Sequence, residues 1–181
     1  MQPNKLLLSA ALTLSCFLPF AQAEDWYAEG FVSGTRATIP SGFAYDREVF
    51  FGTAGLRGGY DFTDNFSIEG EVQTSVDADT VIYALDNTKV GLHSSAGIFG
   101  KYAVPVNERL DLHARLGVAS QEFEYKTGGR KDFIDTFQGL AYGLGGTLNL
   151  TDTLYLRGDA TRYDSSDAET DTISIGAGIR F

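Results

Sequence analysis

The sequence predicts an all-β fold, an eight-stranded antiparallel up-and-down barrel. Apolar and polar residues alternate along several runs, as they do in strands with two different faces. Tight turn signals and longer polar stretches separate these runs in strict alternation. The chain holds 21 glycines, 13 phenylalanines and 9 tyrosines but 4 prolines. This composition suits a closely packed sheet better than a helical protein.

The first 23 residues are expected to be a cleaved signal peptide rather than part of the fold. Lys5 precedes an apolar run from Leu6 to Phe20, and Ala-Gln-Ala follows at 21–23. The run is shorter than the ~20 residues of a membrane-spanning helix, and an Ala-x-Ala site marks signal-peptidase cleavage. A lipoprotein signal cut before Cys16 is the alternative, but no Leu stands three places before that cysteine. We therefore expect one domain, residues 24–181.

The composition of residues 24–181 excludes several classes of protein. This segment keeps all 24 acidic residues and loses one of the 14 basic ones, so nucleic-acid binding is not expected. The single cysteine of the chain lies in the expected signal peptide, which leaves no disulfide framework and no cysteine metal site. We expect no cofactor and no bound metal.

The segment 66–76 shows the alternation most clearly. Ile68 and Val72 fall on one face, whereas Glu69 and Glu71 fall on the other. The same reasoning predicts these strands in order: 25–34, 49–62, 66–76, 90–104, 110–125, 136–150, 154–164 and 171–181. Tight turns are expected at 63–65, 105–108 and 151–153, and long loops at 35–48, 77–89, 126–135 and 165–170. Each strand approaches or exceeds the ~9–11 residues of a tilted transmembrane strand.

The charged residues of the strands fall on one face, and the other face is nearly uncharged. Five acids and five bases make up this set: Glu29, Arg57, Glu69, Glu71, Lys101, Asp111, Arg115, Arg157, Asp159 and Arg180. Charges inside and aliphatic residues outside suit a barrel surrounded by lipid, and the sheet must close because lipid offers no hydrogen bonds. Alternation alone also permits a soluble, lipocalin-like cup with the aliphatic face inside. Alternating loop lengths and aromatic residues near strand ends, such as Trp26, Phe62 and Tyr102, favour the transmembrane barrel.

Three motifs resemble a known family. The last strand ends Ile173-Ser-Ile175-Gly-Ala-Gly-Ile179-Arg-Phe181, which resembles the C-terminal signal read by the barrel assembly machinery. Trp26-Tyr27-Ala-Glu-Gly and Tyr60-Asp-Phe-Thr-Asp-Asn-Phe66 are typical of the OmpA-like transmembrane domain and the outer membrane protein β-barrel domain family. The resemblance covers 24–181. It implies a monomer in the outer membrane of a Gram-negative bacterium, with periplasmic termini, extracellular long loops, and periplasmic chaperones as assembly partners.

The near-balanced charges predict a lumen plugged by ion pairs, because an eight-stranded barrel is just wide enough for side chains to fill it. We therefore expect a structural or surface-interaction role, and a narrow ion or small-solute channel is the alternative function. A third reading is a lipid A-modifying enzyme, because His93 and Ser95 lie two residues apart on one predicted face. Lipid A enzymes must meet lipid outside the barrel and these residues are expected to face inward, so we expect no catalysis. His113 is expected in the lumen.

The predicted long loops carry two further candidate sites. Lys126, Arg130 and Lys131 could contact the phosphates of lipopolysaccharide. Two acidic groups could hold a divalent cation weakly, since carboxylates are ligands for Ca²⁺ and Mg²⁺. They are Asp77, Asp79 and Asp86 in one loop and Asp164, Asp167, Glu169 and Asp171 in the other. A solvated acidic loop is the plainer expectation for both groups.

Overall fold

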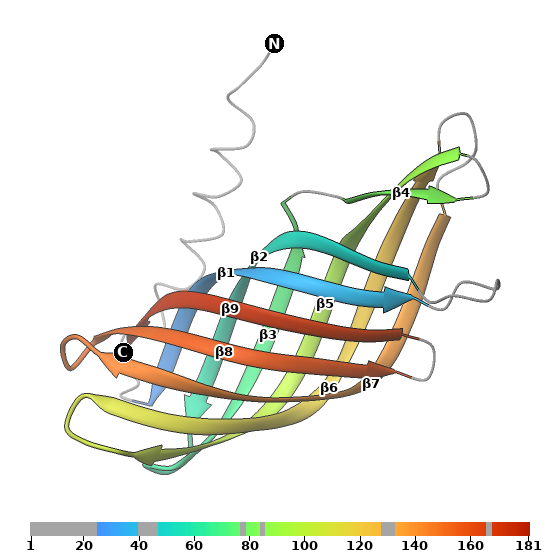
Figure 1. Cartoon of the computed structure of the whole chain (residues 1–181). Helices are drawn as coiled ribbons and strands as arrows, with labels where there is room; N and C mark the ends of the chain where they lie inside the picture. Colours follow the sequence, from blue (N-terminus) through green and yellow to red (C-terminus); the bar gives the residue numbers. More distant parts are fainter. Residues whose placement is uncertain (1–24, 40–46, 77–78, 84–85, 128–132, 166–167) are drawn as a thin grey trace.

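A computed structural model describes residues 25–39, 47–76, 79–83, 86–127, 133–165 and 168–181 (Figure 1). The expected signal peptide lies outside the described residues, so its cleavage stays a prediction. Nine strands are described: β1 (Trp26–Ile39), β2 (Arg47–Asp61), β3 (Phe66–Ser75), β4 (Asp79–Tyr83), β5 (Asp86–Pro105), β6 (Leu110–Thr127), β7 (Phe133–Asn149), β8 (Leu154–Ser165) and β9 (Ala168–Arg180).

Eight of these strands close into one antiparallel barrel. The hydrogen-bonded order runs β3-β2-β1-β9-β8-β7-β6-β5, and β3 pairs with β5 to complete the ring. The ninth strand, β4, pairs with the outer end of β5 and lies where the sequence predicts a loop. The predicted eight-stranded antiparallel barrel is thus confirmed, with β4 as an addition to it.

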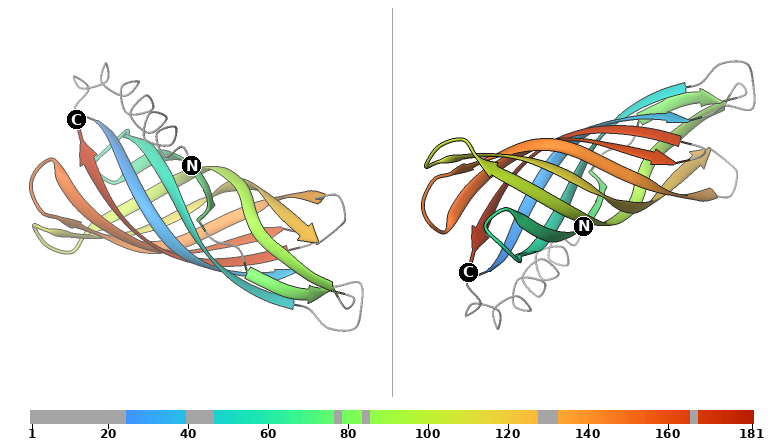
Figure 2. Two further views of the ribbon diagram at one scale, coloured as in Figure 1. Left: turned by 90° about the horizontal axis from the view of Figure 1, so that it is seen from above. Right: turned by 90° about the horizontal axis from the view of Figure 1, so that it is seen from below.

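The start of β1, the C-terminus and the three tight turns share one end of the barrel (Figure 2). The amide of Phe181 donates to the carbonyl of Trp26 at 2.9 Å. Each turn is held by a side-chain oxygen that accepts a backbone amide: Thr63 from Phe66 at 3.0 Å, Asn107 from Leu110 at 3.0 Å, and Thr151 from Leu154 at 2.9 Å. These Thr and Asn residues therefore set the turns that the sequence predicts. We call this the turn end and the opposite end the loop end.

The strands run further toward the loop end than the sequence predicts. β1 continues through 35–39 and β5 begins at Asp86, whereas the sequence predicts loops at 35–48 and 77–89. Polar and charged residues such as Arg36 and Lys89 gave these segments a loop-like composition. Pairing with a neighbouring strand satisfies their backbone groups, so tertiary structure overrides composition there.

A β-bulge in β5 corrects one sequence prediction. The register between β5 and β6 shifts between Leu92 and Ser94, so the extra residue His93 points outward and is exposed. Ser95 is buried in the lumen. The expectation that His93 and Ser95 share an inward face is therefore wrong, because a bulge reverses the alternation along its strand.

The outer wall carries an apolar band and the inner wall carries most of the charge. Exposed aliphatic side chains cover all eight barrel strands: Val32, Leu56, Val72, Ile98, Leu116, Val118, Leu140, Leu144, Leu156, Ile173, Ile175 and Ile179. Aromatic residues lie near the turn end of this band, including Trp26, Phe62 and Tyr102. Among the described residues, no helix is long and apolar enough to cross a membrane.

Candidate functional site

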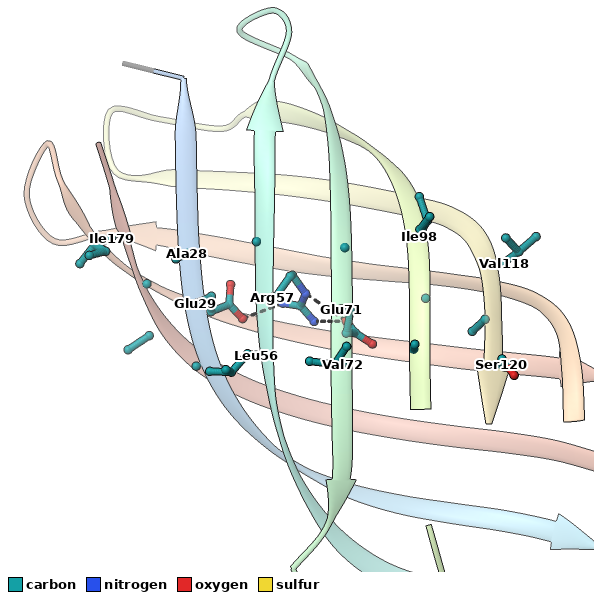
Figure 3. Close-up of a pocket in the computed structure, with 18 of the residues that line it drawn as sticks. Ala28, Glu29, Leu56, Arg57, Glu71, Val72, Ile98, Val118, Ser120 and Ile179 are labelled. Atoms are coloured by element: carbon teal, nitrogen blue, oxygen red, sulfur yellow. Dashed lines mark hydrogen bonds and ion pairs between the residues drawn. The ribbon is translucent and has the colours of Figure 1, made fainter. Parts of the chain in front are cut away.

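Arg57 occupies the centre of an ion-pair network inside the barrel. Its Nη1 donates to Glu29 at 2.6 Å and to Asp159 at 3.2 Å, and its Nη2 donates to Glu71 at 2.8 Å. Figure 3 shows Arg57 on β2 between Glu29 on β1 and Glu71 on β3. Because the three strands are neighbours and the side chains sit at matched register, one guanidinium reaches carboxylates from both sides.

Three more cations complete the network. Arg157 donates to Glu69 and, through Nε, to Asp159 at 2.9 Å. Arg115 donates to Glu71 at 2.8 Å, and Lys101 lies 3.4 Å from Glu69. The network thus joins four acids and four bases, namely Glu29, Glu69, Glu71 and Asp159 with Arg57, Lys101, Arg115 and Arg157. Its formal charge balances, which is the condition under which charges tolerate burial.

The network is shielded from solvent and hydrogen-bonded on most sides. Lys101 is the most accessible of these eight side chains, at 13% exposure, and the others are fully buried. Tyrosine hydroxyls donate to three of the carboxylates: Tyr27 to Glu69 at 2.6 Å, Tyr163 to Glu71 at 2.7 Å, and Tyr155 to Glu29 at 3.3 Å. The phenol groups therefore donate hydrogen bonds to these carboxylates in addition to those from the cations.

Histidine and aromatic rings fill the remaining space beside the charges. His113 Nε2 lies 2.7 Å from Asp159, so it faces the lumen as the sequence predicts. Arg115 stacks over Phe99 at 3.6 Å, and Lys101 lies 4.4 Å from the centre of the Tyr27 ring. Cations over aromatic faces gain electrostatic attraction as well as packing.

Inward-facing glycines make room for two of the tyrosines. Tyr27 pairs across the strands with Gly59, and Tyr155 pairs with Gly178. A Cβ on either glycine would overlap the facing tyrosine ring. The glycines thus let each ring lie flat against the wall beneath a cation, with Arg180 4.8 Å from the Tyr155 ring centre.

Two of the ten predicted lumen residues lie outside the network. Asp111 accepts a hydrogen bond from Asn149 Nδ2 at 3.0 Å, and Arg180 donates to Asn149 Oδ1 at 2.9 Å. Asn149 therefore bridges Asp111 and Arg180 at the turn end of the lumen. Their charges are half-exposed and can remain hydrated without a direct partner.

An apolar cluster fills the lumen at the loop end, which the sequence analysis missed. Ala37, Val49, Phe51, Leu92 and Phe123 are buried together. The Phe51 and Phe123 rings meet edge to face with centroids 6.2 Å apart, and Phe123 is 0% exposed. The alternation places Val49, Phe51 and Phe123 at inward positions of the predicted strands. Ala37 falls in a predicted loop, and the bulge changes the face on which Leu92 lies.

The remaining predicted residues lie at the surface or outside the described part of the chain. Ile173, Ile175 and Ile179 of the expected assembly signal point outward into the apolar band. Arg130 and Lys131 lie outside the described residues. The backbone of Lys126 lies in β6, and its side chain is outside the described part of the structure. The described part of the chain shows no group of three potential metal ligands; Asp77 and Asp167 lie outside it, as do the side chains of Asp79 and Asp86.

A closed barrel with aliphatic side chains outside and ion pairs inside defines the class of transmembrane β-barrels. The comparisons with known proteins place the chain within this class. Residues 7–181 match the family described as "Outer membrane protein beta-barrel domain", so the chain belongs to this family of Gram-negative outer-membrane proteins. The family resemblance read from the sequence is confirmed. A search of curated proteins found no match.

Solved structures share the fold at low sequence identity. Neisserial surface protein A is 15% identical, with a TM-score of 0.64 over 86% of this chain and 97% of that one. OprG of Pseudomonas aeruginosa is 17% identical, with a TM-score of 0.63 over 88% and 96%. Ail, the attachment invasion locus protein of Yersinia pestis, solved with a heparin analogue, is 16% identical, with a TM-score of 0.60 over 87% and 99%.

Proposed function

We propose that this protein is a closed outer-membrane barrel with a structural or surface-interaction role, and that it is neither a channel nor an enzyme. The filled lumen carries this proposal. A solute path would have to cross both the balanced network around Arg57 and the apolar cluster around Phe123. Opening such a path would leave buried charges without partners, at a cost of several kcal/mol for each.

The shared location of the start of β1, the C-terminus and the turns supports one orientation in the membrane. We propose that the turn end, with Trp26 and Phe181, faces the periplasm and that the loops face outward. Cleavage between Ala23 and Glu24 would release a mature chain to periplasmic chaperones and the barrel assembly machinery. Its lasting partners would then be membrane lipid and lipopolysaccharide, with the barrel as a monomer.

Single-channel recording in planar bilayers tests the closed lumen. Folded protein, verified by its altered gel mobility before and after boiling, is inserted and recorded beside a known porin as a positive control. We expect no stable conductance above the bare bilayer. A stable large conductance that scales with inserted protein would overturn the proposal in favour of a channel.

Two cellular measurements test the rest of the proposal. A deletion strain should lose envelope integrity, serum survival or surface binding, whereas its lipid A should have an unchanged mass spectrum. The surface-interaction half gains support from Ail, whose structure was solved with a heparin analogue and whose name describes attachment. A changed lipid A spectrum in the deletion strain would instead favour the enzyme.

A further inference from the structure

A row of charged and aromatic residues crosses the outer wall at the loop end of the apolar band. The strand registers align Phe50 with Arg36, Arg36 with Asp171, Asp171 with Arg162, and Arg162 with Tyr142. The row therefore runs across β2, β1, β9, β8 and β7, on five neighbouring strands. Its side chains point away from the lumen.

Asp171 holds the two arginines in fixed positions. It accepts from Arg36 Nη2 at 2.7 Å, from Arg162 Nε at 2.7 Å and from Arg162 Nη2 at 3.0 Å. The carboxylate therefore keeps the two guanidinium groups side by side.

Each arginine keeps one nitrogen outside hydrogen-bonding distance of its next acidic neighbour. Arg36 Nη1 is 3.8 Å from Glu48, and Arg162 Nη1 is 4.0 Å from Glu169. The two side chains are 44% and 40% exposed. Both Nη1 groups are therefore available to an external acceptor, and guanidinium groups match the geometry of phosphate oxygens.

The position of the row suits the headgroup level of a bilayer. The next outward residue of β9 toward the turn end is Ile173, which is 74% exposed, followed by Ile175. On the loop side, Glu48 and Glu169 are more exposed than the arginines. Going toward the loops, the wall thus changes from aliphatic to cationic and aromatic, and then to acidic.

We propose that Arg36 and Arg162 form a binding site for the phosphate group of a lipid in the outer leaflet, where lipopolysaccharide is the phosphorylated lipid. The site rests on the proposed orientation, which directs the loop end outward. The acyl chains would lie along Ile173 and Ile175 below the row, and Glu48 and Glu169 would repel the phosphate back to the level of the arginines. None of the residues discussed above as lipopolysaccharide contacts belongs to this site.

Native mass spectrometry of the purified barrel with lipid A in detergent tests the site. The wild type is compared with Arg36→Gln, Arg162→Gln and the double variant, and dephosphorylated lipid A with the same acyl chains serves as the matched probe. We expect each single change to weaken binding about fivefold, since one basic residue contributes that factor near a charged membrane surface. The double variant should bind phosphorylated and dephosphorylated lipid A equally.

Arg109→Gln is the control, because Arg109 is exposed in the tight turn at the opposite end and its loss changes the net charge equally. The site is refuted if Arg109→Gln weakens binding as much as Arg36→Gln, or if the wild type does not distinguish the two lipids. Protease digestion of intact cells reports the orientation separately. Protected loops would refute the proposed orientation, whereas cleaved loops with arginine-independent binding would refute the phosphate site alone.

Discussion

The turn-end and loop-end halves of the lumen are built on opposite principles. Behind the apolar band, the lumen holds the ion pairs of Arg57 and Arg157 and the outer wall is aliphatic. At the loop end the lumen holds Phe123, and the outer wall carries Glu122. Along the same strands, the inward face changes from charged to apolar toward the loop end, and the outward face changes from apolar to charged. The medium outside the wall therefore decides which side chains lie inside.

The energetic reason is the identity of that medium. Lipid gives no advantage to burying aliphatic groups inside, so charges can occupy the lumen provided that they pair with one another. Where the wall projects into water, apolar groups gain about 25 cal/mol for each Å² removed from water. The row of Arg36, Asp171 and Arg162 marks the level of the exchange.

The largest expected effect comes from removing one network cation. Arg157→Met removes the guanidinium that contacts both Glu69 and Asp159 and should lower the free energy of unfolding by about 3–5 kcal/mol. Urea titration in lipid vesicles, followed by the fluorescence of Trp26, the single tryptophan, measures the change. The control is Arg109→Met, in an exposed turn. Equal stability of the two variants would contradict a structural role for the network.

The apolar cluster should respond to a loss of volume. Phe123→Ala is expected to cost about 3 kcal/mol, at the low end for a buried aromatic residue, because water near the loop end can enter the space. Phe50→Ala removes the same ring from the outer wall and should cost far less, since Phe50 is exposed. The same urea titration compares them, and similar losses would show that burial in the cluster does not stabilise the barrel.

A charge placed on the outer wall locates the height at which that wall passes from lipid into water. Leu116→Arg puts a cation in the apolar band and should cost about 2 kcal/mol. Glu122→Arg, further along the same face of β6, should cost about 1 kcal/mol or less. Both follow from unfolding in vesicles. A larger penalty at position 122 than at 116 would place the membrane boundary elsewhere.

Adding one methyl group tests the fit between glycine and tyrosine. Gly59→Ala would force the Tyr27 ring away from Glu69 and should destabilise the barrel by about 1–2 kcal/mol. Gly58→Ala is the matched control on the outer face, where the nearest atom to the new Cβ would be 3.8 Å away. Differential scanning calorimetry of the two variants should separate them, and matching melting temperatures would refute the steric account.

Local patterns in the sequence were sufficient for the strands and the turns. Alternation around Glu69 and Glu71 identified β3, and Thr63 identified the turn before it. The pairing of particular charges was not predictable, because Arg57 and Asp159 are distant in sequence and meet only across the closed barrel. The same holds for Asn149, which no charge pattern distinguishes.

The fold class can be read from the sequence, because a period of two residues assigns every side chain to one of two faces. The inward position of the charged face followed from the alternating loop lengths and the aromatic residues near strand ends. Tertiary structure alone decided where that period breaks, at His93, and where strands continue into segments of loop-like composition. It also decided how the lumen is filled. Barrel closure brings residues from non-adjacent strands within a few ångströms, and this distance is not encoded in any local window of the chain.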